Sequence, residues 1–379
     1  MLAWAAHLGQ AEVPGNDPVV AEQAAAEEES VLDKLFDPRD GCFDLSRFLD
    51  EPAGFVPLVV PITEPALGGG AALVPIFIDQ PEGGGRPNIS AIGVMRTTND
   101  SEALFGGVSR YFFDQRLKIV AGAADASINL DFYGLGERLD ELEYNLDATV
   151  GILGGEWKLG KESAWRAGLR YTYAEVDASL SGFKPILPKP LFGEGINYVV
   201  SSLRTAVTYD SRDNVFTPTS GIVSDLSLTM NMEAIGGSSN YEVLNWTNLW
   251  FRPVIRDCLY FGIKAEIEQS FGDQPFYLRP YVKLRGAPAA RYQGEGAASV
   301  EAELRWQFHP RWSLVGFGGA GATWVDESRF ADSESTFTGG AGFRYLIARD
   351  YGLHMGCDLA YGEEGAAFYV QFGGAWGRL

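Results

Sequence analysis

Few side chains in this sequence are arranged for catalysis. Histidine occurs only at His7, His309 and His354, and His354 shares a predicted strand face with Asp358. Four residues along a strand span about 13 Å, which is too far for a direct contact between these two side chains. No nucleophile elbow, paired-carboxylate motif or phosphate loop accompanies them. We therefore predict no enzyme activity and no catalytic residues, and we interpret His354 as a solvated histidine.

Composition argues against nucleic-acid and metal binding and favours curved sheets. The 379 residues include 50 Asp and Glu against 30 Lys and Arg, a formal charge of −20, so we expect no nucleic-acid surface. The chain also holds 46 Gly, 23 Phe, 16 Tyr and 9 Trp, which suits curved β-sheets with aromatic girdles. Its three cysteines are odd in number and lack metal-ligand spacing. We predict neither a metal nor a cofactor.

From Phe55 onward, apolar and polar residues alternate along the chain. Segments of about ten residues can cross a bilayer at a tilt, and the chain has no run of about 18 apolar residues. Backbone in lipid must be fully hydrogen-bonded, so the pattern predicts a closed barrel with apolar faces outward and a polar lumen. The alternative is a soluble β-fold. Apolar sets that share one face include Val300, Ala302, Leu304 and Trp306, against Glu301, Glu303 and Arg305, and also Leu142, Tyr144, Leu146, Ala148, Val150 and Ile152.

The predicted fold class is all-β, a closed antiparallel transmembrane β-barrel of about sixteen strands, an even number as bacterial barrels prefer. The first strand, Phe55–Pro61, is short and contains Pro57 and Pro61, which cannot donate to a ladder, so we expect weak pairing. The predicted strands are 55–61, 67–78, 88–98, 102–113, 116–133, 141–160, 162–179, 197–212, 222–236, 240–254, 258–271, 298–308, 312–325, 335–348, 351–362 and 366–376.

The link between the strands at 197–212 and 222–236 carries the most informative motif. It reads Tyr-Asp-Ser-Arg-Asp-Asn-Val-Phe-Thr-Pro-Thr-Ser-Gly, and its acidic and basic residues are Asp210, Arg212 and Asp213. Pro218 and Gly221 supply the turn chemistry. This cluster resembles the periplasmic turn of the BamA/TamA superfamily, the bacterial surface antigen barrels of Gram-negative outer membranes. The resemblance covers roughly residues 55 to 376 and is specific from Tyr209 onward.

The same resemblance extends to the long segment 272–297, which breaks the alternation. It resembles the inward-folded sixth loop of that superfamily, in which a hydrophobic-Arg-Gly-aromatic motif anchors the loop tip in the lumen. Here the motif reads Leu284-Arg285-Gly286-Ala287. The resemblance implies that Arg285 pairs with Glu303 on the twelfth strand. It also aligns Phe317 to Gly321 with the Phe-x-Asp-x-Gly motif of the thirteenth strand.

Two positions depart from the family pattern. Gly319 stands where the family has Asp, and Ala287 stands where it has an aromatic residue. A desolvated guanidinium needs carboxylate partners, and bidentate pairing is the strongest geometry. With one partner lost, we expect a looser anchor unless Glu301 or Glu266 substitutes. The alternative is that Arg285 lies on an exposed hairpin loop.

Residues 1–54 differ from the rest and form a predicted N-terminal segment beside a barrel domain at 55–379. A short acidic helix is expected over Ala21–Leu35 and one more helical turn over Leu45–Leu49. The segment is either a periplasmic tail or a helix tucked into the barrel as a plug. It leaves no room for the POTRA domains that precede family barrels, so we expect a short form. The N-terminus lacks the basic region of a complete secretory signal, and whether it retains part of one stays open.

The resemblance implies a barrel of the bacterial outer membrane that acts as an insertase or translocase of polypeptides. Lipids, unfolded outer-membrane proteins as clients, and a periplasmic partner would be its contacts. Weak pairing of the first and last strands would open a seam for a client strand, because each proline removes a ladder bond. The alternative is a pore-forming or structural surface barrel without assembly activity. The predicted seam residues are Phe55, Pro57 and Pro61 on the first strand and Phe368, Phe372 and Trp376 on the last.

Overall fold

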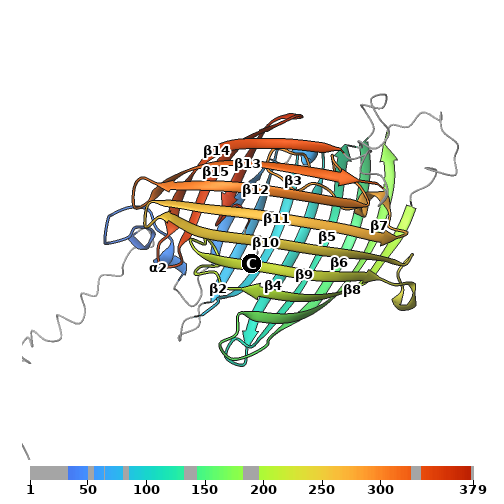
Figure 1. Ribbon diagram of the computed structural model, residues 1–379, viewed down its shortest axis with the longest axis horizontal. Helices are drawn as coiled ribbons and strands as arrows, with labels where there is room; N and C mark the ends of the chain where they lie inside the picture. The colour runs from blue at the N-terminus through green and yellow to red at the C-terminus, as the bar shows by residue number, and fades with distance from the viewer. Residues whose placement is uncertain are drawn as a thin grey trace, which may run out of the picture.

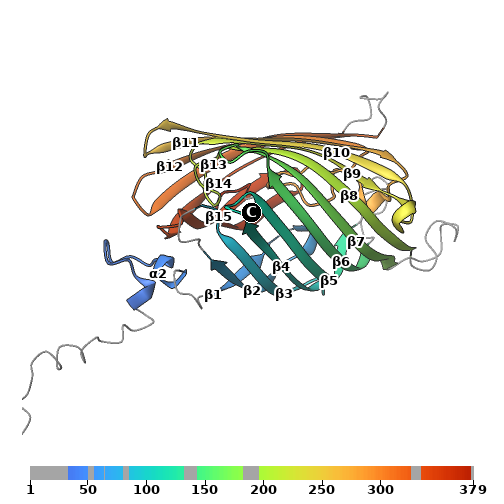
Figure 2. The same ribbon diagram turned by 90° about the horizontal axis from the view of Figure 1, so that it is seen from below.

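Sixteen antiparallel strands form one sheet that curves into a barrel, as Figures 1 and 2 show. The computed structural model describes residues 33–49, 55–63, 65–79, 85–131, 143–181, 196–325 and 334–376. Each strand pairs with its neighbours in the sequence, so the predicted sixteen-stranded fold is confirmed as a nearly closed barrel. The strands are β1 (Phe55–Ile62), β2 (Gly70–Asp79), β3 (Asn88–Thr97), β4 (Glu102–Phe112), β5 (Leu117–Asp131), β6 (Glu143–Lys158), β7 (Trp165–Ser181), β8 (Ile196–Asp210), β9 (Gly221–Asn231), β10 (Tyr241–Ile255), β11 (Leu259–Gly272), β12 (Gly296–Gln307), β13 (Trp312–Trp324), β14 (Ser335–Ala348), β15 (Leu353–Gly362) and β16 (Gly365–Phe372).

The two ends of the barrel differ in their connections. We call the end with the short links 113–116, 159–164 and 256–258 the turn end, and the opposite end the loop end. The helical turns η1 (Asp33–Leu35) and α2 (Ser46–Leu49) lie at the turn end, where α2 is labelled in Figures 1 and 2. The other helical turns are η2 (Pro65–Leu67), η3 (Glu233–Ile235) and η4 (Phe276–Leu278). Within the described ranges, no helix is long and apolar enough to cross a membrane.

Prolines remove hydrogen-bond donors from the first strands. β1 pairs with β2 from Phe55–Phe77 to Ile62–Gly70, and Pro57 lies opposite Pro75. Neither residue has an N–H to donate, so this pair adds nothing to the ladder from its amides. The β2–β3 register also passes over Pro75, from Leu73–Val94 to Ile76–Ala91. The β1 edge of the sheet therefore has few backbone N–H donors for pairing.

Side chains alternate between the outside and the lumen, as strand geometry requires. On β12, Leu304 and Trp306 are exposed on the outside, whereas Glu301 and Arg305 are buried in the lumen. This strand has the apolar-out, polar-in arrangement that the sequence predicts. On β10, Trp246 is exposed outward, and the lumen face is mixed, with Thr247 between the buried Val243 and Leu249.

The loop-end half of β6 has the opposite arrangement, so the expectation of an apolar outside and a polar lumen is wrong there. Leu146, Ala148 and Val150 face the lumen and pack in a cluster with Tyr277 and Leu278. Both of these residues belong to the loop between β11 and β12, which lies inside the barrel. The inward loop buries this face of β6 and makes apolar side chains favourable in the lumen.

Residues 36–49, which we call the N-terminal clip, dock against the turn end of the barrel. Arg311 in the β12–β13 turn is 1% exposed and contacts Asp37 at 2.7 Å, Asp40 at 2.8 Å and also Asp44. Arg349 in the β14–β15 turn contacts Asp37 at 2.8 Å. Two guanidinium groups thus face three carboxylates, which compensates the charge that docking removes from water.

Apolar contacts complete this docking. Leu45 and Leu49 of the clip are buried in one cluster with Phe216 of the β8–β9 turn. A small cavity of about 140 Å³ beside them is also lined by Leu58 of β1 and Phe372 of β16. The clip therefore lies at the mouth of the barrel, where the first and last strands meet.

The described residues place only part of the segment 1–54. Of the helix predicted over Ala21–Leu35, only the last three residues are described, and they form η1. The helical turn predicted over Leu45–Leu49 is present as α2. Residues 1–32 and 50–54 of the predicted N-terminal segment lie outside the described residues, so its assignment as tail or plug stays a prediction.

Removal of the Arg311 charge should release the clip. In Arg311→Met, Asp37 and Asp44 lose their common cation, and breaking a buried ion pair costs about 3–5 kcal/mol. We expect trypsin to cleave at Arg47 at least tenfold faster, while the barrel keeps its heat-dependent gel shift. Arg256→Gln, in an exposed turn at the same end, is the matched control. An unchanged cleavage rate in Arg311→Met would show that apolar packing alone holds the clip.

The clip should also respond to acid. The hydrogen bond from Arg311 holds the pKa of Asp40 well below its ordinary value of 3.8. A carboxyl with a lowered pKa stabilises docking fully above that ordinary value, and the contribution is lost as the pH falls through the lowered one. An environment-sensitive dye on the free Cys42, with Cys258 and Cys357 changed to Ser, should therefore report docking at pH 5 and release well below pH 4. Release that begins near pH 6 would contradict this assignment.

Candidate functional site

The loop between β11 and β12, residues 273–295, returns into the barrel. Val282, Leu284, Ala287 and Tyr292 are buried together in one apolar cluster. The two arms of the loop pair through the amide of Val282, which donates to the carbonyl of Tyr292 at 3.0 Å. Arg285, at the tip, is 8% exposed, so the interpretation of an exposed hairpin loop is wrong.

Three carboxylates surround the Arg285 guanidinium. Glu301 on β12 accepts from Nε at 3.0 Å and from the backbone amide of Arg285 at 3.1 Å. Glu303, on the same strand, accepts from Nη1 at 2.8 Å, and Asp358 on β15 accepts from Nη1 at 2.8 Å. Burial lowers the pKa of Arg285, but the charges of Glu303 and Glu301 outweigh it, so its pKa lies above the ordinary value. The loop tip is thus fixed to two strands by charge-assisted hydrogen bonds.

These contacts resolve the question of the missing Asp at position 319. Glu301 takes the vacant role, as one of the two substitutes considered, and Asp358 is a partner that the sequence analysis missed. Glu266, the other candidate, contacts Lys264 at 2.8 Å instead and Lys283 of the loop at 3.1 Å. The expected loosening of the anchor is therefore not supported by the geometry.

Gly319 itself has a steric reason. A Cβ at this position would lie 2.8 Å from Leu284 Cδ2 and 2.8 Å from the carbonyl oxygen of Val300. A Cβ at Gly321 would lie 2.3 Å from Val282. The loop therefore packs directly against the backbone of β13, and an Asp side chain at position 319 would displace Leu284.

Aromatic rings cover the guanidinium although Ala287 provides none. The ring of Phe317 on β13 lies 3.6 Å from the Arg285 Cζ atom, a cation–π contact. Tyr369 on β16 accepts from the amide of Gly286 at 3.0 Å. Trp376 donates from Nε1 to Glu301 at 2.6 Å. The aromatic residue that the motif lacks is replaced by rings from three other segments.

Trp376 does not lie where the sequence analysis placed it. β16 ends at Phe372, and the chain bends inward after Gly373, whose amide donates to the carbonyl of His354 at 2.7 Å. Trp376 is therefore a lumen residue near Arg285 and Phe251, and its assignment to a seam strand is wrong. Phe368, by contrast, is on β16 and exposed outward.

His354 is also corrected. It is 7% exposed, and its Nε2 atom lies 3.4 Å from Nη1 of Arg305. The interpretation as a solvated histidine is wrong, because the turn at Gly352 and the neighbouring arginine enclose the ring. Asp358 lies on the same strand, but its oxygens contact Arg344 and Arg285 rather than the histidine.

The turn motif at residues 209–221 is held by its own charged side chains. Arg212 donates to Asp210 at 3.0 Å, and Arg86 from the β2–β3 link donates to the same carboxylate at 2.8 Å. Asp213 accepts from the backbone amide of Thr219 at 3.0 Å. Pro218 and Gly221 close the turn, and Gly221 has φ +107°, a conformation that favours glycine. The turn therefore sets the entry of β9 and presents Phe216 to the clip.

The first and last strands form the seam of the barrel. Cα atoms of β1 and β16 approach within 8 Å, but the hydrogen-bonded order of the sheet runs from β1 to β16 without joining them. Pro61 stands within β1, opposite Ala71 of β2. The seam strands of the sequence analysis, except Trp376, are thus the two ends of this sheet. Phe55 and Pro57 are placed here by their backbone register with β2.

The fold and the anchored loop define a class of protein, namely a sixteen-stranded β-barrel whose lumen holds an arginine-anchored loop. The profile described as the Omp85 superfamily domain matches residues 84–362. The chain therefore belongs to the Omp85 superfamily. No curated protein matches the sequence.

Solved structures share the fold at low sequence identity. BamA from Haemophilus ducreyi lacking POTRA domains 1-3 gives a TM-score of 0.56 at 12% identity, over 83% of this chain and 69% of that one. CdiB from Escherichia coli gives 0.58 at 12% identity, over 86% and 68%. CdiB from Acinetobacter baumannii gives 0.56 at 9% identity, over 82% of this chain and 58% of that chain. These similarities establish the architecture of the barrel.

The contacts predict that Glu301 on β12 stabilises the docked loop more than Glu303 does. Glu301 accepts hydrogen bonds from the Arg285 amide, its guanidinium and Trp376, whereas Glu303 accepts one from the guanidinium and lies 3.8 Å from Nη2 of Arg344. Glu301→Gln should therefore destabilise the docked loop by about 2 kcal/mol more than Glu303→Gln, the scale of charged hydrogen bonds. The measurement is the rate of tryptic cleavage at Lys283 and Arg291 in the folded barrel. Equal rates in the two variants, or the reverse order, would contradict the role given to Glu301.

Proposed function

We propose that this protein resides in the bacterial outer membrane and inserts or translocates outer-membrane polypeptides through its seam. The observation that carries the proposal is that β1 and β16 lie together without a shared ladder in the part of the chain that the structure describes. Membership of the Omp85 superfamily and the structural similarity to BamA and CdiB support this reading. The proposal needs no catalytic group or cofactor, and the described residues hold no metal-binding cluster.

The outer face of the barrel supports a lipid environment. Large apolar side chains are exposed around it, from Val59 on β1 through Leu153 on β6 and Trp250 on β10 to Leu359 on β15. Soluble monomers rarely expose apolar patches beyond a few hundred Å². A membrane would also require the closed hydrogen bonding that the barrel provides almost everywhere. Outer-membrane lipids would then be its immediate partners.

The seam supports a role in strand exchange. An edge strand presents free N–H and C=O groups that can pair with an incoming strand. β1 is only eight residues long and contains Pro57 and Pro61, so an incoming strand has few native hydrogen bonds to displace. Unfolded outer-membrane proteins are the clients that this geometry suits, and a periplasmic partner would deliver them.

The anchor supports the mechanical side of the proposal. Asp358 on β15, Tyr369 on β16 and Trp376 all contact the loop tip or its carboxylate partner. The last strands are thereby fixed to the loop, and β1 lacks such contacts among the described residues. When the seam opens, we expect β1 to move and β16 to stay.

A client-folding assay tests the proposal. Barrel in liposomes should accelerate the folding of an unfolded outer-membrane protein, followed by gel shift. After the native cysteines are changed to Ser, cysteines at Val59 and Phe368, both outward, can be joined by bismaleimides of increasing length. The seam cross-link should reduce the acceleration at least tenfold. A cross-link between Val108 and Ala121, which already lie opposite each other in the β4–β5 ladder, is the matched control.

Two results would contradict the proposal in different ways. No acceleration by a barrel with a verified heat shift would favour a pore-forming or structural surface barrel, whose ion conductance should rise when residues 275–295 are deleted. Acceleration that survives the seam cross-link would keep the assembly role but exclude sideways opening.

A further inference from the structure

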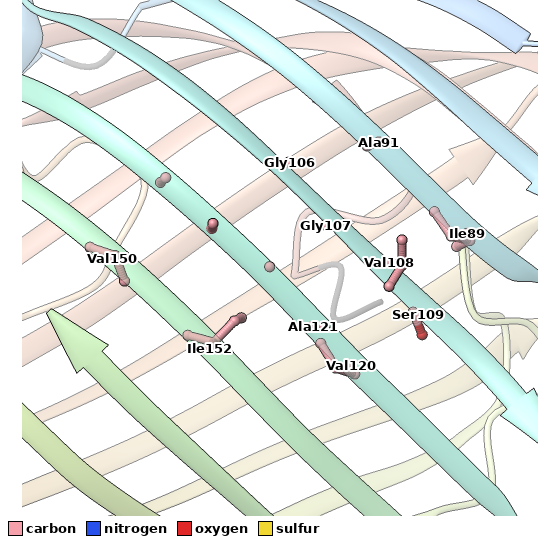
Figure 3. Close-up of a pocket in the computed structure, with 13 residues that line it drawn as sticks. Ile89, Ala91, Gly106, Gly107, Val108, Ser109, Val120, Ala121, Val150 and Ile152 are labelled. Carbon is pink, nitrogen blue, oxygen red and sulfur yellow. The ribbon is translucent and has the colours of Figure 1, made fainter.

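The inner wall formed by β3 to β6 is apolar, unlike the charged wall of β11 to β15 that faces the loop anchor. Its side chains line a concave space with a volume of about 320 Å³, which we call the inner groove. Figure 3 shows Ile89 of β3, Val120 of β5 and Val150 and Ile152 of β6 along it. Gly107 and Gly122 form the floor between them. These residues share the face of Val150, which packs inside the barrel with the loop.

The groove widens where side chains are smallest. Gly107 lies opposite Gly122 across β4 and β5, and Gly122 lies opposite Ile152 across β5 and β6. A Cβ on Gly107 would be 3.1 Å from the carbonyl oxygen of Ala121, so the two glycines deepen the surface by letting the strands present bare backbone. The volume lies at the lower end of the range for small-molecule sites, which favours a single slender ligand.

Two buried cations stand at the turn end of the groove. Lys118 precedes Val120 by two residues on the same face, a separation of about 7 Å along the strand. It is 8% exposed and forms no ion pair within 4 Å among the described residues, although Glu156 lies opposite it on β6. Arg166 of β7 is 6% exposed. Both side chains thus lie inside the barrel beside an apolar surface.

Arg166 is only partly satisfied. Its Nη2 atom donates to the carbonyl of Gln115 at 3.1 Å, and its guanidinium lies 5.5 Å from the ring of Tyr111. Its Nη1 atom is buried and has no hydrogen-bond partner among the described residues. Tyr111 lies opposite Lys118 in the β4–β5 ladder, so the Arg166 guanidinium reaches from β7 across β6 to the pair of strands that carries Lys118. Buried cations with unused donors favour an anionic group.

We propose that the inner groove binds a single-chain anionic amphiphile such as a fatty acid. The acyl chain would lie on Ile89, Val120, Val150 and Ile152, and the carboxylate would accept hydrogen bonds from Lys118 and Arg166. The groove suits this ligand better than a polypeptide strand, because the wall's backbone groups are paired within the sheet and cannot bond another backbone. The proposal concerns the lumen and is independent of the seam and of the proposed function.

Equilibrium dialysis with carbon-14 dodecanoate tests the site, using the full chain in a non-ionic amphipol. We expect saturable binding at one site, at least tenfold tighter than that of dodecyltrimethylammonium. Lys118→Met should weaken dodecanoate binding at least tenfold by removing a cation. Ala124→Phe should abolish it by filling the groove from the lumen face of β5. Lys161→Met in an exposed turn and Ala167→Phe on the outer face of β7 are the matched controls and should bind normally.

A photo-reactive diazirine analogue of dodecanoate locates the ligand independently of substitutions. Cross-linked peptides should map to the lumen face of β3 to β6. Folding of every variant is verified by its heat-dependent gel shift, and the two binding variants act on different parts of the site, so one misfolded variant leaves the other informative. Non-saturable uptake, equal affinity for the cationic amphiphile, normal binding by folded Ala124→Phe, or cross-links on the outer belt would each overturn the proposal.

Discussion

The buried guanidinium of Arg285 requires neutralising carboxylates, and the charged wall of the lumen is arranged around this requirement. Arg285 enters from the loop, and Arg344 extends from β14. Their charges are balanced by Glu301, Glu303 and Asp358 from β12 and β15. Separation of any one of these charges from its partners would leave an uncompensated ion in a poorly hydrated space. This requirement fixes the loop, the inward faces of four strands and the path of the C-terminal segment.

The loop that carries Arg285 to its carboxylate partners also needs space beside the strands. A loop that brings Leu284 and Val282 against β13 can approach only where Gly319 and Gly321 leave room. On the far side, the same loop covers β6 with Tyr277 and Leu278, so apolar residues become favourable on that inner face. One inserted segment therefore explains both a glycine-rich strand and a wall whose polarity is reversed.

Sequence patterns over a few residues predicted the fold, whereas contacts between residues far apart in the sequence form the site. Strand alternation and turn residues were enough to give sixteen strands with bounds correct within a few residues. The link from Arg285 to Glu303 followed from a motif. Asp358 and Trp376 could not be found in this way, because each reaches the loop tip from a distant strand or beyond the last one. The reversed face of β6 was missed for the same reason, since alternation gives the two faces of a strand but not which one another segment covers.

The N-terminal clip contacts residues much later in the chain, and this constrains the order of folding as well as the structure. Asp37 and Arg311 are separated by 274 positions, so the residues made early acquire their partner only when most strands exist. Phe216 and the β14–β15 turn must also be in place before Leu45 and Leu49 can be buried. Contacts of such separation form late, after the entropy of closing the intervening chain has been paid. The clip therefore docks only after the barrel is complete.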